Sequence, residues 1–130
     1  MTRWILLSVI AAAAHHSISG VYDTSREVTI EGTVAQFHFV SPHPFVTVDV
    51  KRGATSAQWR LEMDNRSELS EIGMTGETLK QGDQVVVIGS PGRTQTQSLY
   101  IRRLDRPADG FRYEQVGSSP RIQKSTKKRE

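Results

Sequence analysis

Histidines are the residues of this sequence with the clearest capacity for chemistry. The chain contains four of them, His15, His16, His38 and His43, and it contains no cysteine. The absence of cysteine excludes thiol catalysis and thiolate metal sites, whereas imidazole and amine nitrogens suit Cu(II). His43 stands between Pro42 and Pro44, which restrict the backbone and lower the entropy lost on ordering it. The histidines are therefore candidate copper ligands, and His43 is the strongest candidate among them.

The chemistry of the first histidine pair depends on where the mature chain begins. If His15 is the first residue, its amine and ring nitrogen chelate one ion, and His43 or His38 supplies another imidazole. If Ala14 is first, the amine, two backbone amides and the ring of His16 form a square-planar chelate for copper or nickel. A simpler interpretation stays open, in which the pair is a polar boundary after a leader, His43 is a loop residue and His38 faces solvent.

Residues 1–14 follow the plan of a secretory signal peptide. Arg3 supplies a positive charge, and an apolar run extends from Trp4 to Ala14 and ends in alanines. The run of 11 residues is too short to cross a bilayer as a helix, and a buried N-terminal helix is the alternative. We expect cleavage after Ala14 or Ala13, export to the periplasm or the medium, and no transmembrane segment in the mature protein.

The basic net charge belongs to the ends of the chain rather than to its folded part. The formal charge of the chain is +3, but residues 121–130 carry five basic residues and one acidic residue. Residues 15–120 carry 11 basic and 13 acidic residues, a net charge of −2. This balance does not favour a nucleic-acid-binding face on the domain. Residues 117–130, rich in Ser, Lys and Arg, are expected to be disordered.

Short apolar runs separated by turn residues dominate the sequence from Glu27 onward. They predict strands over residues 28–39, 45–50, 57–63, 84–88 and 98–104, with residues 111–113 as a candidate edge strand. In the first strand the apolar phase changes near Ala35 and Gln36, which requires a bulge or a bend. Asn65, followed three residues later by Glu68, predicts the start of a short helix.

Three strands, a short helix and two strands follow one another in the order of the OB fold. We therefore predict an all-β, OB-like five-stranded barrel over residues 15–116, with one short helix between its third and fourth strands. OB folds bind ligands on the face of the second and third strands, and we expect Phe45 and Tyr100 to be exposed aromatic residues there. The sequence matches no catalytic motif, so we do not expect an enzyme.

Several short motifs, taken in their order and spacing, resemble one family of proteins. They are His15-His16-Ser17, Tyr22-Asp23, residues 30–34, Pro42-His43, Trp59 with Glu62, Gly73-Met74-Thr75 and residues 79–89. Together they resemble the domain of unknown function 6152 family, a group of uncharacterised exported bacterial proteins. That family usually has Asn where this chain has Ser41, and an aromatic residue where it has Ile18. The resemblance implies export and this fold class, and it implies no activity.

These observations lead to two functional hypotheses. The first is a non-enzymatic periplasmic binding or accessory module, whose ligand is a small molecule, a peptide or a component of the cell envelope. The alternative is a copper-binding protein that uses an N-terminal histidine made by signal-peptide cleavage. The first residue of the exported protein separates the two, because a start at Val21 or later would remove His15 and His16.

Overall fold

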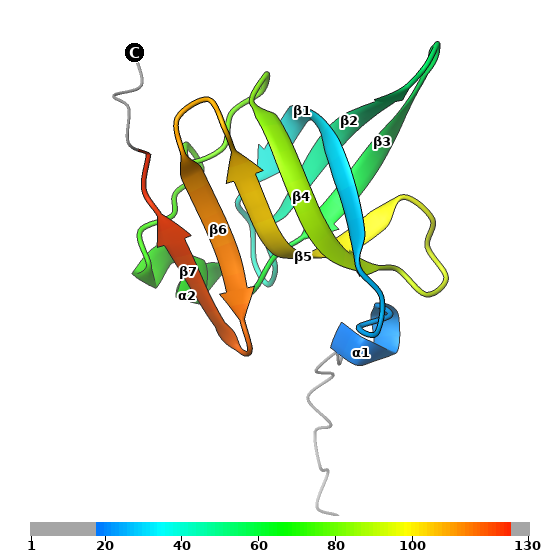
Figure 1. Cartoon of the computed structure of the whole chain (residues 1–130). Helices are drawn as coiled ribbons and strands as arrows, with labels where there is room; N and C mark the ends of the chain where they lie inside the picture. The colour runs from blue at the N-terminus through cyan, green and yellow to red at the C-terminus, as the bar shows by residue number, and fades with distance from the viewer. Residues whose placement is uncertain (1–17, 126–130) are drawn as a thin grey trace, which may run out of the picture.

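The computed structural model describes residues 18–125, and most of its elements are strands (Figure 1). Their order is α1 (Ile18–Val21), β1 (Val28–His38), β2 (Phe45–Arg52), β3 (Thr55–Glu62), α2 (Arg66–Glu71), β4 (Gln84–Pro91), β5 (Ser98–Arg106), β6 (Phe111–Val116) and β7 (Ser119–Gln123). All five predicted strands and the predicted helix are present, close to their expected ends. Neither of the described helices is long and apolar enough to cross a membrane.

Strands β1 to β5 form a closed barrel. Neighbouring strands follow the order β3-β2-β1-β4-β5 with antiparallel pairing, and a parallel pairing of β3 with β5 closes the ring. Helix α2 lies between β3 and β4 in the chain, so the predicted OB-like architecture is confirmed. Strand β4 pairs with one edge of β5. On the other edge, residues 98–100 of β5 pair with β3 and residues 103–106 pair with β6.

Strand β1 serves both sides of the ring because it bends. Its first half pairs with β4 and its second half with β2, and the register shifts between Val34 and Gln36, where the sequence predicts a bulge or a bend. Gly32 lies against β2, and a Cβ at this position would overlap the carbonyl oxygen of Asp49. The close approach of the two backbones therefore requires a glycine here.

Aliphatic side chains from all five barrel strands fill the interior. The buried set includes Ile30, Val34, Val46, Val48, Val50, Leu61, Val85, Val87, Leu99, Ile101 and Leu104. Helix α2 adds Leu69, and the segment after it adds Met74 and Leu79. The side chain of Asn65 caps α2 by accepting a hydrogen bond from the backbone N–H of Glu68 at 2.9 Å. The apolar alternation that predicts the strands thus marks the side of each strand that faces the core.

The end of the chain differs from the prediction. Residues 117–130 are predicted to be disordered, but Ser119–Gln123 forms strand β7, which pairs with β6. Gly117, with a φ of +60°, lies in the turn that joins the two strands. Ile122 packs against the core. A single apolar side chain is too weak a pattern to reveal a strand, whereas pairing with β6, which contains the predicted edge strand, stabilises it.

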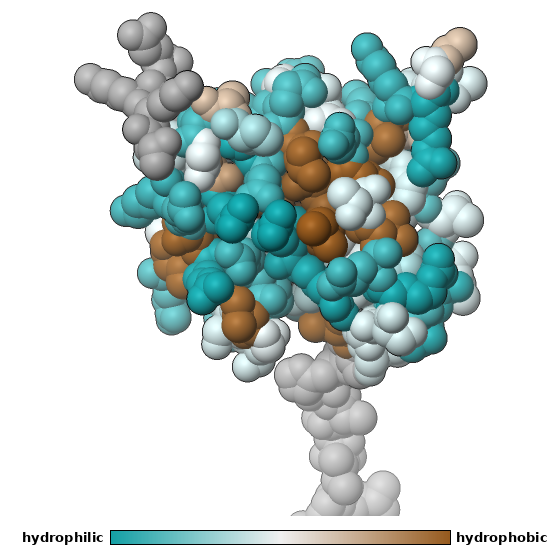
Figure 2. Space-filling model, in the orientation of Figure 1, coloured by the Kyte–Doolittle hydropathy of each residue, from teal (hydrophilic) through white to brown (hydrophobic). Residues whose placement is uncertain are grey.

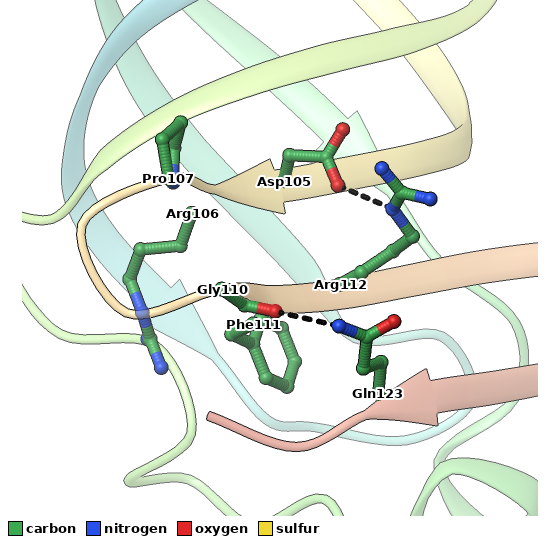
Figure 3. Close-up of a pocket in the computed structure, with 7 residues that line it drawn as sticks. All are labelled: Asp105, Arg106, Pro107, Gly110, Phe111, Arg112 and Gln123. Atoms are coloured by element: carbon green, nitrogen blue, oxygen red, sulfur yellow. Dashed lines mark hydrogen bonds and ion pairs between the residues drawn. The ribbon is translucent and has the colours of Figure 1, made fainter. Parts of the chain in front are cut away.

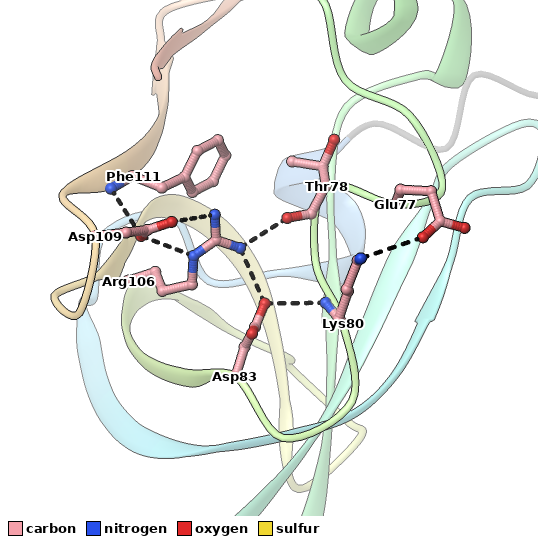
Figure 4. A network of polar contacts seen from close by, with 7 residues as sticks. All are labelled: Glu77, Thr78, Lys80, Asp83, Arg106, Asp109 and Phe111. Carbon is pink, nitrogen blue, oxygen red and sulfur yellow. Dashed lines mark hydrogen bonds and ion pairs between the residues drawn. The ribbon is translucent and has the colours of Figure 1, made fainter. Parts of the chain in front are cut away.

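A buried ion network lies at the end of β5 (Figure 4). The side chain of Arg106 is 5% exposed, and its guanidinium donates to the carbonyl oxygen of Thr78 at 2.7 Å and to Asp83 at 2.9 Å. It also donates twice to the carboxylate of Asp109, at 2.9 Å each. These hydrogen bonds lower the pKa of Asp109 to about 2. The network ties the loop before β4 and the β5–β6 turn to the barrel.

The face of the molecule seen in Figure 2 is mostly hydrophilic, with hydrophobic patches between the hydrophilic residues. One patch lies over the region of β4 and β1. Strand β4 alternates the buried Val85 and Val87 with the half-buried Val86 and Ile88. Apolar residues therefore occupy both faces of this strand, which explains its continuous apolar run in the sequence.

Candidate functional site

A groove lies where the parallel pairing of β3 and β5 closes the barrel, and we call it the β3–β5 groove. Its volume is about 330 Å³, which is within the range of small-molecule sites. The N-terminal segment, the β1–β2 loop (residues 39–44), the β4–β5 loop (residues 92–97) and both strands contribute to it. The lining residues are Ile18, Val21, Tyr22, Pro42, His43, Arg60, Glu62, Gln95 and Tyr100. In OB folds these two loops and the face of the second and third strands form the ligand site, so the β3–β5 groove shares both loops and β3 with that site.

Hydrogen bonds hold the walls of the β3–β5 groove in place. In the β1–β2 loop, the carbonyl oxygen of Pro42 accepts the backbone N–H of Arg66, the first residue of helix α2, at 3.0 Å. On the opposite wall, Arg93 of the β4–β5 loop donates its backbone N–H to Val21 at 2.9 Å. The Nε of Arg93 donates to the carbonyl oxygen of Ser19 at 2.9 Å. Segments far apart in the sequence are thereby fixed around one groove.

Tyr22 and Glu62 join two walls of the groove. The hydroxyl of Tyr22 donates to Oε2 of Glu62, although the two residues are 40 positions apart. The ring of Tyr22 is buried, and its centroid lies 5.7 Å from that of Tyr100 at an angle of 47°. Burial, followed by the hydrogen bond to Glu62, raises the pKa of Tyr22. The phenol therefore keeps its proton at neutral pH and acts as a donor.

Tyr100 has a buried hydroxyl without a hydrogen-bond partner. The residue is only 5% exposed, because β3 and β4 pair with its strand on both sides. The expectation that Tyr100 is an exposed aromatic residue is therefore wrong, although it does line the groove. Burial raises the pKa of its hydroxyl, and the negative charges of Asp64, Glu62 and Glu68 raise it further. The result is a neutral phenol whose hydrogen-bonding capacity the protein leaves unused.

Phe45, the other predicted ligand-face residue, lies next to the groove rather than in its lining. It is half-buried, and its ring stacks on the ring of His38, with centroids 4.2 Å apart and planes at 15°. The guanidinium carbon of Arg60 lies 4.1 Å from the centroid of Phe45. The ring of the half-buried His38 therefore contacts Phe45 on the sheet. A metal-binding role for His38 and a ligand contact at Phe45 stay predictions.

His43 is the histidine that the structure places in the groove. Its Nδ1 lies 3.1 Å from the carbonyl oxygen of Met63. A carbonyl oxygen only accepts, so Nδ1 must carry the hydrogen, and in the neutral ring Nε2 is left with its lone pair. Among residues 18–125, no three His, Asp or Glu side chains are grouped so as to hold a metal ion. His15 and His16 lie outside the described residues, so a metal site stays a prediction.

Two acids near Tyr100 form a pair that the sequence analysis does not identify as part of a site. The neighbouring carboxyl group of Asp64 is the main cause that raises the pKa of Glu68. Gln115 donates from Nε2 to Oδ2 of Asp64 at 2.8 Å. Oε2 of Glu68 is buried and has no partner. The region around the hydroxyl of Tyr100 is therefore acidic.

A second hollow, between β5 and β6, differs from the groove in its polar groups (Figure 3). Its volume is about 380 Å³, and Asp105, Arg106, Pro107, Gly110, Phe111, Arg112 and Gln123 line it. Arg112 donates to Asp105 at 2.6 Å, and Gln123 donates to the carbonyl oxygen of Gly110 at 3.4 Å. Arg106 belongs to the buried network described above. Because these polar side chains already have partners, the β3–β5 groove is the better candidate site.

The sequence of the chain was compared with those of known proteins and protein families. No curated protein matches this chain. The sequence model of DUF6152, which is described as a family of unknown function, matches residues 5–100. All the residues that line the groove, from Ile18 to Tyr100, lie inside this match. Since the match extends over most of the 130 residues, the chain belongs to the DUF6152 family.

Proposed function

We propose that this protein is a non-enzymatic binding module that takes a small ligand into the β3–β5 groove. The observation that carries this proposal is the hydroxyl of Tyr100, which belongs to a groove residue, is buried and has no partner. A buried polar group without a hydrogen bond destabilises a protein by about 1–3 kcal/mol. A ligand that bonds to this hydroxyl offsets that loss, which gives the unpaired group a function.

The other groups of the groove support binding rather than bond breaking. Burial raises the pKa values of Tyr22 and Tyr100, so neither phenol ionises at neutral pH to act as a base or a nucleophile. Glu62 already accepts the hydroxyl hydrogen of Tyr22. General acid–base catalysis favours a pKa near the working pH, whereas fixed donors and acceptors are what a binding site needs to orient a ligand.

A fragment screen by NMR on ¹⁵N-labelled protein tests this function. Bound fragments are expected to shift the amide signals of groove residues such as Tyr22, His43 and Tyr100. The variant Gln95→Trp places a bulky ring in the groove and should abolish these shifts. The matched control Gln123→Trp places the same ring in the hollow of Figure 3 and should leave them unchanged. Fragments that bind only in that hollow, or that still bind to Gln95→Trp, would contradict the proposal.

Export is part of the same proposal. Residues 1–14 have the pattern of a signal peptide and lie outside the described residues. Because of that pattern, we propose that the module acts in the periplasm or outside the cell. The intact mass of the protein from a periplasmic extract gives its first residue, which is expected to be His15 or Ala14. Full-length protein that stays in the cytoplasm would refute this part of the proposal.

Copper binding is a second candidate function, and the tautomer of His43 favours it. A histidine that binds a metal through one nitrogen commonly donates its other N–H to a backbone carbonyl, and Nδ1 of His43 faces the carbonyl oxygen of Met63 in this way. Ile18 lines the same groove. His16 precedes it by two residues, so their Cα atoms are within about 8 Å of each other. The covalent chain therefore allows the histidine pair to reach the same groove.

Titration of Cu(II) into the exported, correctly processed protein tests this candidate. We expect binding tighter than about 1 μM and nitrogen couplings from imidazole in the electron paramagnetic resonance spectrum. His43→Ala should weaken the binding, whereas His38→Ala, which removes a ring stacked on Phe45, should not. Binding that is unaffected by both His15→Ala and His43→Ala would end the idea.

A further inference from the structure

We infer that the β3–β5 groove recognises its ligand through a primary ammonium group, an inference that rests on the proposed binding function. Three of the residues that line the groove carry an acceptor: Glu62 has a carboxylate, Tyr100 has a buried hydroxyl oxygen without a partner, and His43 has Nε2. An ammonium group has three N–H donors and no acceptor. It is therefore the ligand group that matches a carboxylate, a phenol oxygen and an imidazole lone pair at the same time.

The electric field at Tyr100 has the sign that a cation requires. The charged groups that act on its hydroxyl are the acids Asp64, Glu62 and Glu68. Tyr100 is only 5% exposed, and its hydroxyl is buried and has no partner in the protein. A ligand group that reaches this hydroxyl would form a hydrogen bond that the protein alone does not make. A carboxylate or phosphate would be repelled at this position.

Arg60 limits how many positive charges the ligand can carry. Arg60 also lines the groove, and its guanidinium lies over the ring of Phe45, on the side of β2. A second ammonium group at this end would meet a like charge. The side chains of Ile18, Val21 and Pro42 provide apolar walls, which favour a hydrocarbon body. The chemistry of the lining thus fits a small monoamine with an apolar body.

Three probes of one shape test the inference: benzylamine, benzyl alcohol and benzoate. Each is titrated into the full processed protein and followed by ¹⁵N NMR shifts. Benzylamine is expected to bind with a Kd of about 1 mM, as befits a fragment. Benzyl alcohol should bind at least about tenfold more weakly, since it lacks the charge-assisted hydrogen bond. Benzoate should give no saturable shift in the groove.

Substitutions at Glu62 and Tyr100 test whether these two side chains bind the ammonium group of benzylamine. Glu62→Gln keeps an oxygen that accepts from Tyr22, but it removes the negative charge and should weaken benzylamine about tenfold. Glu114→Gln makes the same change on β6, where the carboxylate pairs with Arg121, and should leave binding unchanged. Tyr100→Phe should weaken benzylamine several-fold. Unchanged chemical shifts elsewhere in each variant confirm that it has folded.

The outcomes separate this inference from the proposed function. Tighter binding of benzylamine, reduced by Glu62→Gln and not by Glu114→Gln, supports recognition of an ammonium group. Equal binding of amine and alcohol in the groove overturns the ammonium inference and leaves the binding function standing. Failure of all three probes to bind also overturns the inference, and the broader fragment screen then decides the binding function by itself.

Discussion

The two ends of strand β5 treat buried polar groups in opposite ways. At its last residue, the guanidinium of Arg106 is held by two carboxylates and a backbone carbonyl (Figure 4). Near its first residue, the hydroxyl of Tyr100 has no partner. Among residues 18–125, Oε2 of Glu68 is the other buried side-chain oxygen found without one, and its negative charge acts on Tyr100. The two buried oxygens without a hydrogen-bond partner thus belong to the region around the start of β5.

This difference separates scaffold from site. A buried polar group that is fully bonded contributes to a unique fold, and breaking it leaves a charge without a partner. A buried group that is not bonded in the protein alone reduces stability, and it gains its bond only from something that enters. Since residues 100 and 106 belong to one strand, about 20 Å apart at 3.3 Å per residue, their contrast does not come from different secondary structure.

The largest expected effect comes from breaking the scaffold end. Arg106→Leu leaves Asp83 and Asp109, both largely buried, without their counterion. Removing one partner from a buried ion network destabilises a protein by about 3–5 kcal/mol, so the free energy of unfolding in urea should fall by that amount. The control Arg103→Leu removes a partly exposed pair with Asp105 and should lower stability by about 1 kcal/mol or less. Equal effects of the two variants would contradict the scaffold role.

The next effect is a dependence on pH that belongs to the same end. Hydrogen bonds from Arg106 lower the pKa of Asp109 from its ordinary value of 3.8 to about 2. A group whose pKa is lower in the folded state contributes stability above its unfolded pKa. That contribution should be complete above about pH 4 and be lost as the pH falls towards 2.

Urea unfolding measured between pH 2 and pH 5 checks this dependence. In Asp109→Asn the loss of stability over this interval should be clearly smaller than in the unchanged protein. Asp49→Asn changes an exposed aspartate on β2 and should keep the original slope. A slope in Asp109→Asn that equals that of the unchanged protein would show that Asp109 does not carry the effect.

At the groove end, Tyr22→Phe should produce an intermediate effect. The substitution removes the donor to the half-buried carboxylate of Glu62 and keeps the ring that packs near Tyr100. A hydrogen bond to a charged group contributes about 1.5–3 kcal/mol, and partial exposure of Glu62 places the expected loss near the lower value. Thermal unfolding measures it, and a loss below about 0.5 kcal/mol would mean that the bond does not hold the groove walls together.

The barrel could be predicted from the sequence because its determinants are local. Alternating apolar residues indicate the strands, the change of phase near Ala35 and Gln36 indicates the bend of β1, and Asn65 indicates the start of α2. Each of these patterns depends on neighbours within a few positions. Strand β7 is not predicted from the sequence because it contains one core-facing apolar residue, Ile122, and is stabilised mainly by pairing with β6.

The candidate site was predicted only in outline, because its contacts are long-range. The expected ligand face was that of the second and third strands; of its two predicted residues Tyr100 lines the groove and Phe45 does not, and the metal candidate His43 also lines it. The pairing of Tyr22 with Glu62 joins residues 40 positions apart, and no local pattern indicates it. Tyr100 was expected to be exposed, since alternation along β5 does not reveal that β3 closes the barrel over its first half.

The smallest expected effect gives the sharpest test of the contrast. Tyr100→Phe removes a hydroxyl without a partner, so the free energy of unfolding should not fall. It should rise by up to about 1 kcal/mol, because the void left by the hydroxyl offsets part of the gain from removing an unmet hydrogen bond. Tyr113→Phe makes the same chemical change at a buried tyrosine whose hydroxyl donates to Gln115 at 2.9 Å, and it should lower stability by about 1 kcal/mol. Urea unfolding of both variants at one pH compares them directly. If Tyr100→Phe were the more damaging substitution, its hydroxyl would have to be bonded in the free protein, and the groove would lose the unmet hydrogen bond on which its proposed function depends.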